Sequence, residues 1–268
     1  MAGALDDIRV LDLTEPLGHY AGYLLANLGA DVIKVEPPTG DPSRVWEPLL
    51  PNVPEIESGM QFLLMNVGKK GITLDINQEK GKETLLKLLS ETDVLLQSWT
   101  PEEAALLGLN PTDLREKFPN LINASVTGWG LDGPYASLAY SDIVSVAMAG
   151  LMNLSGFAEG PPAQLPDHQG FHCASLNLAA GVMAALLERD SSGIAQDVEV
   201  SMHESLLIAE ETAMQTADIR GIDRERTGGI SGVIPVKLPG MGLYSAQDGW
   251  IFVMAAGVAG AGFDGLIT

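Results

Sequence analysis

The chain has a single cysteine, Cys173, among its 268 residues. One thiol supplies neither an intrachain disulfide nor a zinc cluster. The N-terminal stretch carries Asp6 and Asp7 before its first apolar run, whereas a secretory signal needs basic residues followed by a longer apolar segment. No uninterrupted apolar run reaches the length of a membrane span. These absences predict a cytoplasmic protein without membrane contact.

Positive charge is scarce: 15 Lys and Arg stand against 35 Asp and Glu, for a formal net charge of -20. Such a chain repels nucleic acid and anionic membrane surfaces, so neither is an expected partner. A ligand that carries phosphates would need a local group of basic residues, or cations from a partner subunit.

The common ligand-binding motifs are also missing. The chain has no GxGxxG after its first predicted strand, no GxxxxGK[ST] and no GxSxG. Its four histidines do not follow HExxH spacing, and no carboxylate–histidine array indicates a metal. Motif reading therefore excludes a metal site and leaves the ligand open.

What the sequence does have is a regular alternation of short apolar runs and amphipathic segments. Expected strands are 8–14, 31–38, 71–76, 93–99, 121–130 and 197–202, and expected helices are 19–30, 79–92, 101–109, 111–119, 141–156, 170–190 and 203–219. This order predicts an α/β fold with a Rossmann-like, doubly wound parallel sheet.

A polar, glycine-rich stretch divides the chain. Residues 1–219 are the predicted large domain, 220–232 the linker, and 233–268 the start of a smaller α+β domain. Residues 242–256 predict a β-hairpin with Asp248-Gly249 at its turn.

Several segments resemble, in order, the class III CoA-transferases (CaiB/BaiF family). They are VLDLTEPLGHYAGYLLANLGADVIKVEPPTGDPSR (10–44), MNVGKKGITLDI (65–76), TGWGLDGPYASLAYSDIV (127–144), AGVMAALLERDSSGIAQDVEVSM (180–202) and DGWI (248–251). The resemblance implies an interlocked dimer that moves CoA from an acyl-CoA donor to a carboxylic acid acceptor. CoA is then a substrate, with no covalently bound cofactor. Family chains are longer, so the small domain is expected to be incomplete here.

In this family an aspartate carboxylate attacks the acyl-CoA, which is covalent catalysis by a side chain. Glycine-rich loops donate backbone N–H groups to the developing oxyanions. Alignment of the long helix through Gly181, Ala185 and Arg189 places the aspartate column on Phe171. A phenylalanine cannot attack a thioester, so no catalytic residue is assigned. The fallback candidates are Asp167 as the nucleophile and His172 as a general base.

Both fallback residues also have ordinary structural interpretations. Asp167 lies between a proline and a glycine, which favours a solvated loop carboxylate. His172 and Cys173 fit packing positions at the start of an apolar helix. Neither residue type by itself indicates catalysis.

The resemblance also implies CoA contacts. The candidates are Lys34, Arg44, Lys69, Lys70, Gly128 and Gly130. Of these, Lys69 and Lys70 match a basic pair of the family and are the first choice for a CoA phosphate. Pro37, Thr100 and Leu106 stand where the family commonly has basic residues. The resemblance therefore implies fewer contacts to the phosphates and the adenine of CoA.

Four hypotheses remain. The first is a non-catalytic subunit that pairs with a homologous catalytic chain in a heterodimer or heterotetramer. The second is a CoA-transferase that acts alone or with itself and uses an unusual nucleophile. The third is an acyl-CoA racemase, although Ser141 stands where that branch has a histidine before Asp142. The fourth is an unrelated Rossmann-like binding module.

Overall fold

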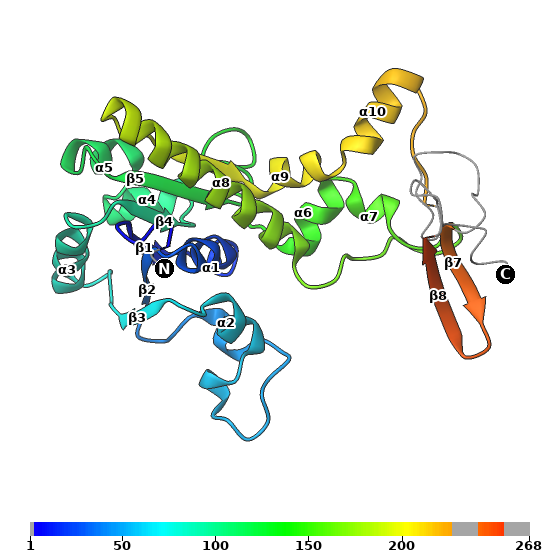
Figure 1. Cartoon of the computed structure of the whole chain (residues 1–268), viewed down its shortest axis with the longest axis horizontal. Coiled ribbons are helices and arrows are strands. Elements are labelled where there is room, and N and C mark those ends of the chain that lie inside the picture. Colours follow the sequence, from blue (N-terminus) through cyan, green and yellow to red (C-terminus); the bar gives the residue numbers. More distant parts are fainter. Residues whose placement is uncertain (1–2, 227–240, 255–268) are drawn as a thin grey trace. The chain divides into compact units, whose positions relative to one another are not determined.

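The computed structural model describes residues 3–226 and 241–254. The chain divides into two compact units, residues 1–142 with 169–205 and residues 143–168 with 206–268 (Figure 1). The predicted boundary at 220–232 stays a prediction, because part of that segment lies outside the described residues.

The first unit is built on a six-stranded parallel sheet with the order β3-β2-β1-β4-β5-β6. Its strands are β1 (Arg9–Leu13), β2 (Asp31–Glu36), β3 (Lys70–Thr73), β4 (Val94–Gln97), β5 (Ile122–Thr127) and β6 (Val198–Ser201). The central strands β4 and β5 are buried at every position, as expected when helices cover both faces of a parallel sheet. The predicted α/β sheet is confirmed.

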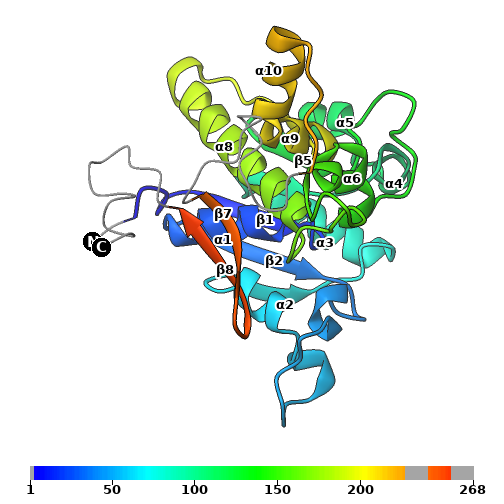
Figure 2. The ribbon, with the colours of Figure 1, turned by 90° about the vertical axis from the view of Figure 1, so that its right-hand side faces the viewer.

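Helices cover the two faces of this sheet. They are α1 (His19–Asn27), α3 (Glu79–Leu89), α4 (Pro101–Leu107), α5 (Pro111–Lys117) and α8 (Gln169–Ser192). On one face, Leu85 and Leu114 pack with Leu11 and Leu95 in a single buried cluster. On the other, α1 and α8 lie side by side in both views (Figures 1 and 2).

The helix α8 is rich in small and aliphatic residues as far as Leu187, ends in a polar turn, and packs against β5 and β6. Gly181 permits a close approach, since a Cβ there would come within 2.6 Å of Val198 Cγ1. By length and composition α8 would also qualify as a membrane span, with half of its most apolar window buried in the structure. Core helices of globular proteins meet the same criterion, so the expected absence of membrane contact stays a prediction.

An arm projects from the first unit between β2 and β3. It contains two short 3-10 helices, η1 (Pro42–Val45) and η2 (Glu55–Glu57), and the helix α2 (Met60–Met65). Pro37, Gly40 and several prolines start the arm, because they stop β2 and favour turns. The arm exposes many apolar side chains: Val45, Leu49, Val53, Ile56, Met60, Leu63, Leu64 and Val67.

The second unit contains α7 (Leu151–Leu154), α10 (Glu211–Arg220), most of α6 (Asp142–Met148) and the end of α9 (Met202–Ala209). Its strands β7 (Met241–Ala246) and β8 (Gly249–Met254) form an antiparallel hairpin. The hairpin is confirmed, with Gln247 and Asp248 at the turn and Gly249 already paired with Ala246.

Two predicted helices are each split in two. The segment predicted as one helix over 141–156 breaks at Gly150, whose φ of +96° does not continue an α-helix. The segment predicted over 203–219 breaks at Glu210. Periodicity alone does not detect such breaks, because the apolar spacing resumes on the far side.

Candidate functional site

A pocket of about 340 Å³ opens at the carboxyl edge of the parallel sheet. It is lined by the last residues of β1 and β2, by the segments that follow β1, β2 and β3, and by Trp99 after β4. Strand order reverses between β1 and β4, and ligands of doubly wound sheets bind outside the carboxyl ends at such a reversal. The pocket is therefore the candidate ligand site of the first unit.

Lys34, predicted to contact CoA, lines this pocket but is only 3% exposed. Its ammonium group donates to the Thr14 carbonyl and lies 3.1 Å from His19 Nε2 and 3.3 Å from Asp41 Oδ2. An ammonium has three donors, and these three neighbours can use them all.

Lys69 is also enclosed. Its side chain is 1% exposed, and Nζ donates to Asp12 Oδ2 at 2.8 Å, to the His19 carbonyl at 2.9 Å and to Asn66 Oδ1 at 2.8 Å. A phosphate could bind either lysine only by displacing these internal acceptors. The geometry favours a structural role for both, and their assignment to CoA stays a prediction.

Together these residues form a buried ionic network of Asp12, His19, Lys34, Asp41 and Lys69. The network joins β1, α1 and β2 to the residues that directly precede η1 and β3. Burial would raise the pKa of Asp12, but Lys69, Lys34 and His19 outweigh it and hold that pKa well below its usual range. Burial, helped by Lys34, lowers the pKa of His19 to about 4 despite the opposing Asp41. The imidazole is therefore neutral near pH 7. No sequence motif indicated this network.

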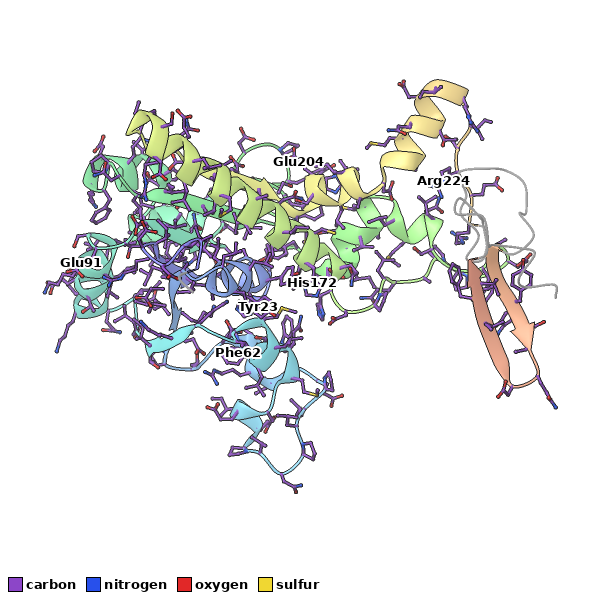
Figure 3. All side chains as sticks on the ribbon, in the orientation of Figure 1. Tyr23, Phe62, Glu91, His172, Glu204 and Arg224 are labelled. Atoms are coloured by element: carbon purple, nitrogen blue, oxygen red, sulfur yellow. The ribbon has the colours of Figure 1, made fainter. Side chains whose placement is uncertain are left out.

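Arg44 anchors the arm. Its guanidinium donates to both carboxylate oxygens of Glu36, at 2.6 and 2.8 Å, and to Glu57 at 3.1 Å. It also lies 4.0 Å from the centre of the Phe62 ring, labelled in Figure 3. Arg44 thus joins β2 to the arm, and a CoA contact would have to share an occupied guanidinium.

Lys70 differs from its neighbour. Its side chain is 70% exposed, and it pairs with Asp31 at 2.5 Å. Exposed pairs of this kind are weak and exchange easily. Of the four predicted basic CoA contacts, Lys70 has the most accessible side chain.

The glycines predicted to contact CoA lie in the loop after β5. A Cβ on Gly128 would come within 2.4 Å of the Tyr140 side chain, and Gly130 has a φ of +94°. Gly130 donates its N–H to Thr127 Oγ1 at 2.9 Å. Both glycines are thus required by the local backbone path, which leaves their predicted ligand role untested.

The start of α8 holds the position where the resemblance expects a nucleophile. Phe171 occupies it and is 7% exposed. A carboxylate of another segment nevertheless lies beside the start of α8. The Gly170 N–H donates to Asp142 Oδ1 at 2.7 Å. The Asp142 side chain is buried, and Oδ2 has no hydrogen-bond partner among the described residues. Sequence reasoning assigned Asp142 only to the racemase comparison and missed this contact.

His172, labelled in Figure 3, projects from α8 toward Tyr20, with ring centroids 5.5 Å apart in an edge-to-face arrangement. Cys173 is partly buried, and burial together with Asp142 raises the pKa of its thiol. A raised pKa disfavours the reactive thiolate. The geometry therefore favours packing roles for both residues.

Asp167 and His168 belong to the second unit. Both have positive φ values, 56° and 51°, in the region that non-glycine residues rarely adopt. The fallback role of Asp167 as nucleophile stays a prediction.

Comparison with known proteins decides the family. The model of CoA-transferase family III matches residues 5–260, nearly the whole chain. The chain belongs to CoA-transferase family III. The same family is found among solved structures: a CAIB/BAIF family protein from Brucella suis shares the fold with a TM-score of 0.84 and 29% identity, over 93% of this chain and 65% of that one.

Curated relatives carry specific names. Subunit BbsE of the succinyl-CoA:(R)-benzylsuccinate CoA-transferase of Thauera aromatica is 34% identical over 92% of this chain and 58% of its own length. The succinyl-CoA–D-citramalate CoA-transferase of Chloroflexus aurantiacus is 34% identical over 94% and 61%. The formyl-CoA:oxalate CoA-transferase of Streptomyces avermitilis is 38% identical over 77% and 50%. This family III chain thus spans between half and about three fifths of the curated relatives it matches.

Proposed function

We propose that this family III chain is a non-catalytic subunit of a cytoplasmic CoA-transferase. The assembly moves CoA between an acyl-CoA donor and a carboxylic acid acceptor. A homologous chain in a heterodimer or heterotetramer supplies the attacking aspartate, and CoA is a substrate rather than a bound cofactor. The observation that carries the proposal is Phe171, a buried phenyl ring at the position where the family resemblance requires a carboxylate.

The internal hydrogen bonds and ion pairs of the basic residues support the same proposal. Lys34 and Lys69 are enclosed by internal acceptors, and Arg44 is held by Glu36 and Glu57. A chain that binds and activates CoA itself needs free cations for the phosphates. A chain whose partner performs these tasks does not.

Exposed apolar surface supports a partner chain. The arm between β2 and β3 exposes the apolar side chains named above, and the hairpin of the second unit exposes Trp250, Ile251 and Phe252 at more than half of their surface. Apolar surface of this extent on a folded chain is typical of protein contact sites. A relative's name is consistent with this arrangement, since BbsE is described as a subunit.

One observation favours a second candidate, an active enzyme with an unusual nucleophile. Asp142 places a carboxylate against the first turn of α8, next to Phe171. Its oxygen Oδ2 is buried, however, and would have to be uncovered before it could attack a thioester. A buried carboxylate without access to substrate cannot act as a nucleophile in this arrangement.

The first prediction separates the two candidates. The chain alone, incubated with succinyl-CoA and examined by intact mass spectrometry, should acquire no acyl or CoA adduct, and hydroxylamine should trap none. Coexpression with a family III chain that carries the aspartate should give a stable complex and transferase turnover. An adduct that maps to Asp142 or Asp167, and is lost in Asp142→Asn or Asp167→Asn, would instead establish the second candidate, a chain that is catalytically active without a partner.

A further inference from the structure

The loop between β5 and α6 carries an Asp-Gly pair at its tip, and both Asp132 and Gly133 are exposed. The backbone on each side of the pair is held. Leu131 donates its N–H to Glu199 Oε1 at 2.6 Å, and the Gly133 carbonyl accepts the Ala136 N–H at 3.4 Å. The pair thus lies in solvent between two anchored positions.

The two groups that could react with each other within this pair are both free. Among the residues that the structure describes, the Asp132 carboxylate and the Gly133 N–H have no hydrogen-bond or ion-pair partner. Gly133 has a φ of +90°, and a Cβ built on it would meet no atom within 4 Å. Neither packing nor a polar contact therefore prevents the carboxyl carbon from turning toward the neighbouring nitrogen.

Such a pair permits a reaction within the main chain that consumes no other reactant than water. The Gly133 nitrogen attacks the side-chain carboxyl carbon of Asp132, the amide proton and the carboxyl hydroxyl leave as water, and a succinimide ring closes. Glycine favours this attack because it has no Cβ to obstruct it. Water then opens the ring at either carbonyl. Opening at the side-chain carbonyl restores aspartate, whereas opening at the main-chain carbonyl leaves an isoaspartate.

The hairpin of the second unit contains the same dipeptide in a different backbone setting. Asp248 and Gly249 are also exposed, so exposure does not distinguish the two pairs. Gly249, however, is already paired with Ala246 in the antiparallel ladder. This ladder has to open before the nitrogen of Gly249 can reach the carboxyl carbon. A third Asp-Gly pair, at 264–265, lies outside the described residues.

We propose that Asp132-Gly133 is a site of spontaneous isoaspartate formation in the folded chain, while the hairpin pair is protected. The product carries one additional main-chain carbon and a carboxylate on a different carbon atom. It is therefore chemically suited to enzymes that methylate isoaspartyl carboxylates. The added carbon lies in the loop that also carries Gly128 and Gly130, so conversion changes the backbone path of that loop.

Labelled water tests the proposal on the full chain. Each ring opening takes one oxygen from solvent, so incubation near pH 7 in water enriched in heavy oxygen labels every carboxyl that has passed through the ring. Peptide mass spectrometry with electron-based fragmentation locates the label. Asp132 should acquire it at least about fivefold faster than Asp248, since only the hairpin pair needs a local opening. An isoaspartyl methyltransferase with a radioactive methyl donor should count isoaspartate in the same samples.

Unfolding and two matched variants show whether the fold causes the difference. In urea the two positions should acquire label at rates within about twofold of each other, because the dipeptides are the same and the ladder is gone. Asp132→Glu should abolish both the label at position 132 and most of the methyl acceptance, since the longer side chain cannot close the five-membered ring. Asp248→Glu should leave both signals of the loop unchanged.

Three results would overturn the inference: absence of label at Asp132 in the folded chain, labelling of Asp248 at an equal or higher rate, or a difference between the positions that persists in urea. The inference goes beyond the proposed function and is tested without acyl-CoA or a partner chain. Its failure would leave the assignment of the chain as a transferase subunit untouched.

Discussion

Replacing Lys69 by alanine should lower the free energy of unfolding by about 3–5 kcal/mol, because it leaves the Asp12 carboxylate buried without its principal cation. Asp12 is fully buried, and the Lys69 ammonium lies 2.8 Å from its Oδ2. The Asp12 oxygen Oδ1 keeps its bonds from Thr14 in the variant, so the loss is mainly electrostatic. Urea unfolding followed by circular dichroism measures the change.

The adjacent lysine is a control of the same type in the same segment. Lys70→Ala removes an exposed pair with Asp31 and should change the free energy of unfolding by no more than about 1 kcal/mol. The double variant Asp12→Asn, Lys69→Met should recover part of the loss, because it removes both charges together. Equal effects of Lys69→Ala and Lys70→Ala would contradict the buried network.

Acid should destabilise the first unit in a range set by His19. The pKa of this imidazole falls from 6.5 to about 4 on folding, so between these values the unfolded chain binds a proton that the folded chain does not. Stability is therefore complete above about pH 6.5 and decreases as the pH falls toward 4. At pH 4.5 the contribution of His19 alone amounts to a loss of roughly 2–3 kcal/mol.

His19→Gln isolates this effect. The variant should be less stable than the parent chain at pH 7, where it disturbs the contacts to Asp41 and Lys34, and should lose less stability between pH 7 and pH 4.5. Asp12 and Asp41, whose pKa values are held below their usual range, extend the acid sensitivity of both proteins below pH 4. An identical pH dependence in the variant and the parent would show that His19 is not the titrating group.

The sheet could be predicted from sequence because its signals are local. The apolar runs of β1, β2, β4 and β5 each end at residues that stop a strand, and the intervening helices carry leucines at helical spacing. Thr100 and Pro101 also mark the start of α4 locally, since Thr100 and Glu103 form a capping box.

The candidate site could not be predicted to the same extent, because it depends on contacts between distant segments. The stretch Lys69-Lys70 looks like a solvated basic turn, and nothing nearby indicates that Lys69 reaches Asp12, 57 positions earlier. The bond between Asp142 and the start of α8 spans 28 positions in the same way. Register and tertiary packing decide such contacts, and neither is visible in one sequence.

The contrast between the two neighbouring lysines has a consequence for chemical modification. An amine-directed reagent requires an uncharged, reachable nitrogen, and Lys69 offers its nitrogen only to three internal oxygens. Acylating reagents or reductive methylation applied to the native chain should mark position 70 and spare position 69, and the protected position should become reactive only as the protein unfolds. Adjacent positions thus provide a built-in reporter of whether the interior around β1 is intact.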